Sequence, residues 1–227
     1  MKVEIWSDVM CPFCYIGKRK FEAALAQFQH SSEIEIEWRS FQLNPAMVTD
    51  PDKNIDAYLA EIKGISLERA RQLNAHVTKL AAEVGLTYNF EKAIVANSFD
   101  AHRFTHFAKS KGLQNAAEER LFRAYFTEGK NTADHSMLVQ LGTEIGLAQK
   151  ELEEMLNSNA FAQAVNKDIE EARQLGVSGV PFFVLARKYA VSGAQESAVF
   201  LSALQKAYND SREESNETSG AVAEEQS

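Results

Sequence analysis

The feature that most constrains this chain is a pair of cysteines, Cys11 and Cys14, which are the only two in 227 residues. They fall where an alternating segment, residues 2–7, gives way to a helical pattern from Pro12 to about Gln29. Proline suits the first position of a helix, because no backbone N–H needs a partner there. The sequence therefore predicts a strand, then two thiols at the start of a helix.

This position gives the two thiols different properties. Free backbone N–H groups and the helix dipole favour an anion at a helix N-terminus, and hence the thiolate of Cys11. Cys14 lies about one turn further in, less exposed but within reach of a disulfide with Cys11. Thiol–disulfide exchange uses such an accessible thiolate with a second thiol behind it. Phe13 cannot donate to the thiolate as a histidine could, so we expect a couple less oxidising than about −120 mV.

The rest of the hydrophobic pattern predicts a βαβ unit, a long helical block and a ββα unit. After the first helix, the predicted elements are a half-buried strand at 33–41, helices from about 53 to 175, a hairpin of Phe182–Ala186 and Tyr189–Val191, and a helix at about 196–208. Strand, helix, strand gives a parallel pair. Because neither end holds a full sheet alone, we expect an α/β fold in which both ends share one sheet.

This order of elements also predicts the domains. Residues 1–50 and 176–208 are expected to form one domain, and 51–175 an all-helical insertion whose last helix packs back on the sheet. Residues 209–227 hold six acids, one base and a single aliphatic residue larger than alanine, which predicts a disordered acidic tail. An acidic docking tail is the functional alternative.

Charge and hydropathy limit the partners. The net charge is −8 and no Lys/Arg cluster occurs, which argues against nucleic acid or an anionic membrane as the main partner. No leader-like stretch and no bilayer-spanning apolar run is found, so we expect a cytoplasmic protein. In a reducing compartment a structural disulfide is disfavoured, and a close thiol pair is expected to be catalytic or metal-binding.

The metal alternative is zinc. A C-x-x-C pair supplies half of a tetrahedral site, and His102 and His106, four residues apart on a helix, could supply the rest. The halves of a structural zinc site usually lie close in sequence, whereas here most of a domain intervenes. We therefore expect no metal, with both histidines as polar positions beside buried Phe99, Phe104 and Phe107.

A second candidate element is the segment GVSGVPFFVL. It is at least a helix-to-strand loop, with Gly176 ending the helix. However, an X-Pro bond at a strand entrance is also a place where a cis bond is tolerated. Beside the thiols, the backbone of Val180, before Pro181, could then pair with a peptide substrate as an added strand.

The segments SDVMCPFCYIGK, NSFDAHR and GVSGVPFFV together resemble the thioredoxin superfamily, within it the DsbA-type proteins and their FrnE-like cytoplasmic branch. The resemblance covers residues 1 to about 208. It implies a thioredoxin fold interrupted by a helical domain. It also implies that Cys11 is the nucleophile, Cys14 the resolving thiol and Pro181 a cis proline after Val180. Pro12 and Phe13 are predicted to join this substrate-binding surface.

The same resemblance leaves an alternative function open. Related 2-hydroxychromene-2-carboxylate isomerases and kappa-class glutathione transferases carry serine at the first cysteine position and use glutathione. Gln195, Glu196 and Ser197 open the last helix, a terminus that could receive a carboxylate, although an ordinary cap is the preferred interpretation. A third, non-enzymatic hypothesis is a chaperone-like or partner-binding protein, suggested by the Phe-rich stretch 99–126 and by the tail, although such spacing of Phe is typical of a core.

The leading hypothesis is a cytoplasmic thiol–disulfide oxidoreductase or isomerase. Its expected redox group is the Cys11–Cys14 disulfide with no other bound cofactor, and glutathione or another low-molecular-weight thiol is a candidate co-substrate. Protein or small-molecule thiols and disulfides are the expected partners. The sequence leaves the direction of electron flow and the oligomeric state open.

Overall fold

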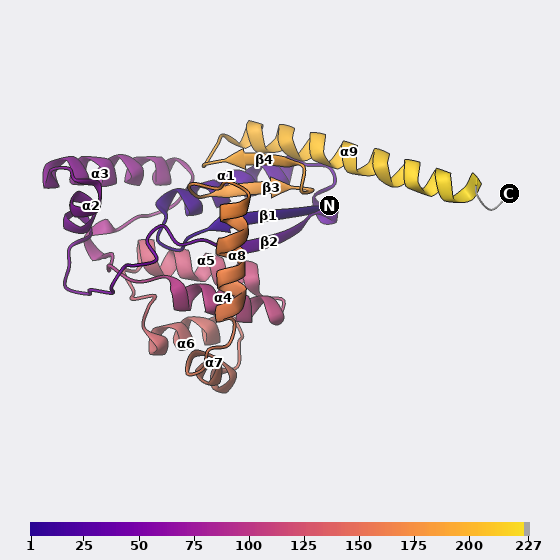
Figure 1. Ribbon diagram of the computed structural model, residues 1–227. Coiled ribbons are helices and arrows are strands. Elements are labelled where there is room, and N and C mark those ends of the chain that lie inside the picture. The colour runs from indigo at the N-terminus through magenta and orange to yellow at the C-terminus, as the bar shows by residue number, and fades with distance from the viewer. Residues whose placement is uncertain (225–227) are drawn as a thin grey trace.

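At the centre of the chain is a four-stranded sheet in the order β2-β1-β3-β4 (Figure 1). The computed structural model describes the backbone of residues 1–224 and the side chains of residues 1–213. The strands are β1 (Lys2–Ser7), β2 (Glu35–Ser40), β3 (Phe182–Leu185) and β4 (Tyr189–Ser192). β1 pairs in parallel with β2, and β3 pairs antiparallel with both β1 and β4. Both ends of the chain therefore share one sheet, which confirms the predicted α/β architecture.

Helices surround this sheet. Helix α1 (Pro12–Gln27) joins β1 to β2, and α9 (Ser197–Glu224) follows β4. Between β2 and β3 the chain forms a helical block, which Figure 1 shows to one side of the sheet and below it. Its elements are α2 (Ile55–Lys63), α3 (Leu67–Glu83), η2 (Phe90–Lys92), α4 (Phe99–Ser110), α5 (Gln114–Phe122), the π-helix η3 (Arg123–Thr127), α6 (His135–Glu144), α7 (Gln149–Leu156) and α8 (Ala162–Gln174). A 3-10 turn, η1 (Ser31–Glu33), precedes β2.

The two faces of the sheet are covered by different helices. On one face, Phe21 of α1, Phe183 of β3 and Phe200 of α9 form a ring cluster with centroid separations of 4.6–5.7 Å. On the other face, the Trp6 indole N–H donates to the backbone oxygen of Asp168 on α8 at 2.9 Å. The last helix of the block thus packs on the sheet. Because apolar side chains are buried on both faces of the sheet, the position of β1 is fixed. The start of α1, which follows β1, is therefore fixed as well.

The structure differs from the sequence prediction at the C-terminus. We expected the last helix to end near residue 208 and a disordered tail to follow, but α9 continues to Glu224. The segment after 208 lacks proline and is rich in Glu, a good helix former. Because residues 197–208 already form a helix on the sheet, extension proceeds without a new nucleation step. Residues 225–227 of the predicted tail lie outside the described residues.

Candidate active site

Cys11 and Cys14 lie at the junction of β1 and α1. Cys11 is the N-cap residue of α1, with extended backbone (φ −85°, ψ 111°), and Pro12 follows at the start of the helix. The Cys11 N–H donates to Asp8 O at 2.9 Å, and the Cys14 N–H donates to Cys11 O at 3.0 Å. Both thiols are free, and the two residues are 4% and 1% exposed. The pair is a dithiol, and Cys11, which we expected to be accessible, is buried almost as deeply as Cys14.

The second segment of the site comes from the other end of the chain. The Cys11 thiol lies 3.3 Å from the backbone oxygen of Val180, although 169 positions separate the two residues. The Val180–Pro181 peptide bond is cis. On the α1 side, a Cβ added at Gly17 would lie 2.9 Å from Pro181 Cγ, so only glycine permits this close approach. The Gly193 N–H donates to Pro181 O at 2.8 Å and ties the loop to the end of β4.

Burial dominates the chemistry of Cys14. It raises the pKa of this thiol well above its ordinary value, and the neighbouring Cys11 raises it further. The Ser7 side chain and the Asp8 backbone N–H act on the same sulfur in the opposite direction, because both favour its thiolate. The balance keeps Cys14 protonated at neutral pH, so Cys11 is the member of the pair suited to react first.

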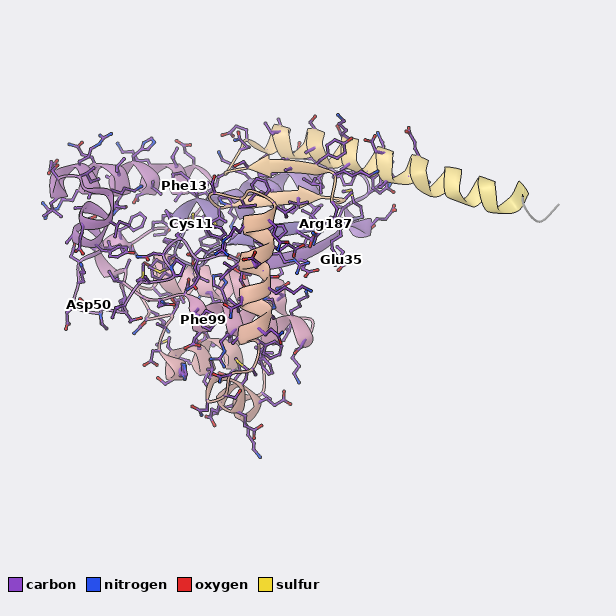
Figure 2. The ribbon with its side chains drawn as sticks, in the orientation of Figure 1. Cys11, Phe13, Glu35, Asp50, Phe99 and Arg187 are labelled. Carbon is purple, nitrogen blue, oxygen red and sulfur yellow. The ribbon has the colours of Figure 1, made fainter. Side chains whose placement is uncertain are left out.

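An aromatic side chain from the helical block contacts the start of α1. The Tyr88 hydroxyl donates to Pro12 O at 2.7 Å, and the Tyr88 ring stacks on Phe126 with centroids 4.6 Å apart. Burial raises the pKa of Tyr88, and the nearby Cys11 and Cys14 raise it further, so its hydroxyl remains a donor. Phe13 is 40% exposed next to Cys11 (Figure 2). The approach to Cys11 is therefore apolar.

Buried titratable groups gather around Asp8. Asp8 Oδ1 lies 3.6 Å from His102 Nε2, and Asp8 Oδ2 accepts the Leu43 N–H at 2.8 Å. Burial lowers the pKa of His102, but Asp8 outweighs this and raises it. Burial raises the pKa of Glu118 to about 7 against the opposing effects of His102 and Lys18. Glu118 is 3% exposed and its Oε2 has no hydrogen-bond partner, so this carboxyl changes its protonation near neutral pH.

The histidines of the zinc alternative face separate carboxylates. His102 lies by Asp8, whereas His106 Nε2 is 3.0 Å from Asp168 Oδ2. Both are buried polar side chains, and Phe104 and Phe107 are buried as expected, whereas Phe99 is only half-buried. Within the part of the chain that the structure describes, no three His, Cys, Asp or Glu side chains are arranged to hold a metal ion.

Two other features singled out in the sequence serve the fold. At the start of α9, Glu196 pairs with Lys20 at 2.5 Å, and the Gln195 side chain donates to Ser192 O at 2.9 Å. These are contacts of an ordinary helix start. The Phe-rich stretch lies in the core, since Phe104, Phe122 and Phe126 are each at most 1% exposed. This burial argues against binding of a partner through the Phe-rich stretch.

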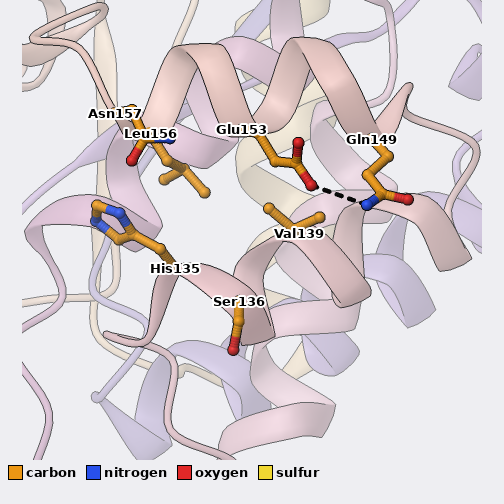
Figure 3. A pocket seen from close by; sticks show the side chains of 7 residues that line it. All are labelled: His135, Ser136, Val139, Gln149, Glu153, Leu156 and Asn157. Atoms are coloured by element: carbon orange, nitrogen blue, oxygen red, sulfur yellow. Dashed lines mark hydrogen bonds between the residues drawn. The ribbon is translucent and has the colours of Figure 1, made fainter.

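A pocket of about 300 Å³ lies between α6 and α7 (Figure 3). His135, Ser136 and Val139 line it from α6. On the α7 side, the Gln149 amide donates to Glu153 at 2.8 Å. No residue of the thiol site lines this pocket.

The geometry of thiols, helix start and facing loop agrees with the comparison with known families. Residues 2–205 match the model of the DSBA-like thioredoxin domain. The chain belongs to this family. Its DsbA-like thioredoxin fold, with the helical block inserted between β2 and β3, matches the fold class expected from the sequence.

Solved structures extend this DsbA-like assignment. The crystal structure of a probable DsbA oxidoreductase from Streptomyces coelicolor has 39% sequence identity and a TM-score of 0.87, covering 92% of this chain and 90% of that one. A 2-hydroxychromene-2-carboxylate isomerase has 18% identity and a TM-score of 0.67, covering 94% and 98%. The cytosolic disulfide reductase DsbM from Pseudomonas aeruginosa has 16% identity and a TM-score of 0.63, covering 95% and 99%. It has also been solved with GSH. The last two proteins share the fold.

Sequence reasoning missed three residues at this DsbA-like site. Ser7, Tyr88 and Glu118 come from β1, from the segment after α3 and from α5, and only the fold brings each of them near the junction of β1 and α1. Only Ser7, placed just before the motif at the predicted strand end, carried a signal that could have identified it. Among residues 1–224, no helix has the length and apolar character needed to cross a membrane.

Proposed function

We propose that this DsbA-like protein is a cytoplasmic thiol–disulfide oxidoreductase with Cys11 as nucleophile and Cys14 as resolving thiol. The observation that carries the proposal is the position of Cys11. Its sulfur lies at the N-terminus of α1, 3.3 Å from Val180 O, with Cys14 buried one turn behind it. The helix N-terminus favours negative charge on Cys11. The proposed placement in the FrnE-like branch rests on the sequence motifs alone.

The reaction runs in two exchanges. In the reductive direction, the Cys11 thiolate attacks one sulfur of a substrate disulfide, that disulfide breaks, and one substrate thiolate leaves with the electron pair. The Cys14 sulfur then loses its proton and attacks the Cys11 sulfur, which releases the second substrate thiolate and forms the Cys11–Cys14 disulfide. The oxidative direction reverses these steps. The substrate is reduced by two electrons and the protein is oxidised by two.

The surface around Cys11 suits a peptide or a thiol compound. The backbone of Val180 before Pro181 is proposed to pair with an extended substrate segment, and Pro12 and exposed Phe13 to contact its apolar side chains. Glutathione or another low-molecular-weight thiol is proposed to return the protein to the dithiol. The GSH-bound structure of DsbM, a protein of the same fold, supports testing glutathione first.

An insulin-reduction assay tests the proposal. Cys11→Ser should reduce the rate to that of the uncatalysed reaction, and Cys14→Ala should leave only a mixed disulfide that does not turn over. Ser192→Ala, on β4, is a control with a similar change in size, and it should retain wild-type activity. Equal rates for wild type and Cys11→Ser would contradict the proposal.

The alternative is a glutathione-dependent isomerase or transferase. The fold shared with 2-hydroxychromene-2-carboxylate isomerase supports testing it. That reaction does not require a second thiol. Tight glutathione binding together with full activity of Cys14→Ala on a small organic substrate would favour it. Loss of turnover in Cys14→Ala, with a mixed disulfide left on Cys11, favours the oxidoreductase.

A further inference from the structure

The chain between β2 and α2, residues 42–49, forms neither helix nor strand, yet hydrogen bonds to Asn97 fix its course. Asn97 belongs to the NSFDAHR motif noted in the sequence. Its side-chain amide donates to Met47 O at 2.8 Å and accepts the Gln42 amide N–H at 3.0 Å. Its backbone N–H donates to Thr49 Oγ1 at 3.0 Å. One residue of the helical block therefore holds both ends of this segment, the 42–49 loop.

The start of the 42–49 loop is also joined to the turn that carries Cys11. The Asp8 carboxylate accepts the Leu43 N–H at 2.8 Å through Oδ2 and the Met10 N–H at 3.3 Å through Oδ1. The backbone oxygen of Asp8 accepts the Cys11 N–H at 2.9 Å. Asp8 is buried. It thus connects Leu43 directly to the turn before the nucleophile, and the position of Leu43 relative to Cys11 is fixed.

The side chain of Leu43 remains exposed although its backbone is held. Leu43 is 52% exposed, and Phe13, two residues after Cys11, is 40% exposed. A single exposed leucine needs no explanation. Here, however, large apolar side chains from two separate segments are exposed around the turn that carries one thiol, and a buried carboxylate holds one of these segments. Apolar groups that are held in place before binding lose little conformational entropy when a partner covers them.

We propose that Leu43 is a specificity-determining residue, which favours polypeptide disulfides whose cysteine has apolar neighbours, and that Asn97 is its positioning residue. This inference rests on the proposed function. In an extended segment paired with the backbone of Val180, the residues beside the substrate cysteine lie close to the surface around Cys11. An apolar side chain there packs on Leu43. Glutathione lacks such a neighbour, because its cysteine is joined to a γ-glutamyl group and to glycine.

Leu43 acts on binding and not on the exchange of sulfur bonds. It contacts the part of the substrate next to the cysteine, so this contact is the same before and during attack by Cys11. Loss of such uniform binding raises the half-saturation concentration of the substrate and leaves the limiting rate unchanged. Covering a half-exposed leucine accounts for about a tenfold change in that concentration.

The experiment mixes the reduced protein with three disulfides and follows formation of the Cys11–Cys14 disulfide over a range of substrate concentrations. The probes are glutathione disulfide and the disulfide-linked dimers of two peptides, Gly-Leu-Cys-Leu-Gly and Gly-Ser-Cys-Ser-Gly. For the leucine peptide, Leu43→Ser should raise the half-saturation concentration about tenfold and leave the limiting rate unchanged. Both values for the serine peptide and for glutathione disulfide should stay as in wild type. Leu43→Met keeps an apolar side chain and should behave as wild type.

Asn97→Ala should raise the half-saturation concentration for the leucine peptide and leave the values for the other two disulfides unchanged. A role in folding alone would slow the reaction with all three. Leu67→Ser, which removes a leucine 40% exposed at the start of α3, is the matched control and should change none of these values. If Asn97→Ala does not fold, Gln42→Ala removes one of the same hydrogen bonds and should raise the leucine-peptide value about threefold.

Three outcomes overturn the role of Leu43: equal half-saturation of wild type by the two peptides, an unchanged value in Leu43→Ser, or an equal rise in Leu67→Ser. Equal losses with all three disulfides in Asn97→Ala, or no rise in Gln42→Ala, overturn the positioning role of Asn97. Failure of the proposed function looks different, because wild type would then form no Cys11–Cys14 disulfide with any of the three probes.

Discussion

Two groups of buried polar side chains lie beside β1, and they differ in how completely they are satisfied. The sheet network consists of the buried Glu4, Glu37 and Asp168 with the half-buried Arg39, and the thiol cluster consists of the buried Ser7, Asp8, Cys14, His102 and Glu118. In the sheet network every carboxylate has a cationic partner. In the thiol cluster the Ser7 hydroxyl and Glu118 Oε2 have no hydrogen-bond partner among the described residues.

The sheet network balances its charges. Arg39 donates to Glu4 Oε1 at 3.0 Å and to Asp168 Oδ1 at 2.9 Å. Burial raises the pKa of Glu37, but hydrogen bonds from Lys109 and Lys2 outweigh this and hold it at about 2. The pKa of Asp168 is likewise lowered despite its burial, by His106, the Ser40 N–H and Arg39. These carboxylates stay charged and join β1, β2 and α8.

In the thiol cluster, burial prevails instead. It raises the pKa of Cys14 and brings that of Glu118 to about 7. Buried groups without full compensation cost stability, and chains tend to keep them where they act in chemistry. The same strand therefore has a charge-balanced side that stabilises the fold and an unbalanced side next to Asp8 and Cys14.

The largest effect should come from unbalancing the sheet network. Arg39→Met leaves Glu4 and Asp168 buried without this partner, and it should lower the free energy of unfolding by about 3 kcal/mol. Urea unfolding measures the loss. Arg173→Met removes a surface pair with Glu170, whose side chains are 74% and 51% exposed, and should cost at most about 0.5 kcal/mol. Equal losses in both variants would remove the contrast between the regions.

The second-largest effect should come from removing the buried carboxyl of Glu118 from the thiol cluster. This change should raise the free energy of unfolding, whereas Arg39→Met lowers it. Glu118 has a raised pKa in the folded state, so the fold binds more protons than the unfolded chain and loses stability as the pH rises from about 4.5 to about 7. Glu118→Gln removes this loss. It should therefore stabilise the protein by up to about 3 kcal/mol at pH 8 and leave the free energy of unfolding at pH 4 unchanged.

Glu37→Gln provides the mirror control in the same urea titrations. The pKa of Glu37 is lowered in the folded state. Its contribution to the free energy of unfolding is therefore present above about pH 4.5 and is lost as the pH falls toward about 2. Glu37→Gln should therefore destabilise at neutral pH. If Glu118→Gln destabilised at pH 8 as well, the thiol cluster would not be the unbalanced region described above.

A third, smaller effect concerns the redox couple. Because Phe13 cannot donate to the Cys11 thiolate, the reduction potential should lie below about −120 mV. Phe13→His adds a donor at an exposed position and should raise the potential by roughly 30–60 mV, the equivalent of one hydrogen bond to a charged group. Equilibration with glutathione buffers measures both values. Phe13→Leu should leave the potential unchanged, and a wild-type value near −120 mV would contradict this account.

The smallest effect is expected for Tyr88→Phe. It removes the hydrogen bond to Pro12 O but keeps the ring on Phe126, so the free energy of unfolding should fall by about 1 kcal/mol. Chemical denaturation of the reduced protein measures it. A loss as large as that of Arg39→Met would mean that the helical block holds the start of α1 more strongly than one neutral hydrogen bond allows.

The sequence predicted those parts of the molecule that local rules determine. The position of Cys11 at a helix start follows from the strand pattern before it and from Pro12 after it. The hairpin was placed within one residue at each end. Val180 entered as a candidate through its proline and the resemblance, and the 3.3 Å approach to Cys11 is a property of the fold.

The remaining features depend on packing between distant elements. Tyr88 and Glu118 carry no local pattern, because their roles arise where the helical block meets the end of β1. The burial of His106 against Asp168 joins α4 to α8 across more than fifty residues. The predicted end of α9 was wrong for another reason. The prediction used the composition of the segment after 208 alone, whereas in the structure this segment continues a helix that already packs on the sheet.

The most direct test of the central claim is which sulfur reacts first. Glutathione disulfide is added to the reduced Cys14→Ala and Cys11→Ser variants, and peptide mass spectrometry locates the adduct. The account predicts rapid modification of Cys11 in Cys14→Ala and almost none of Cys14 in Cys11→Ser, since Cys14 is 1% exposed and kept protonated. Modification of Cys14 at the rate of Cys11 would contradict it.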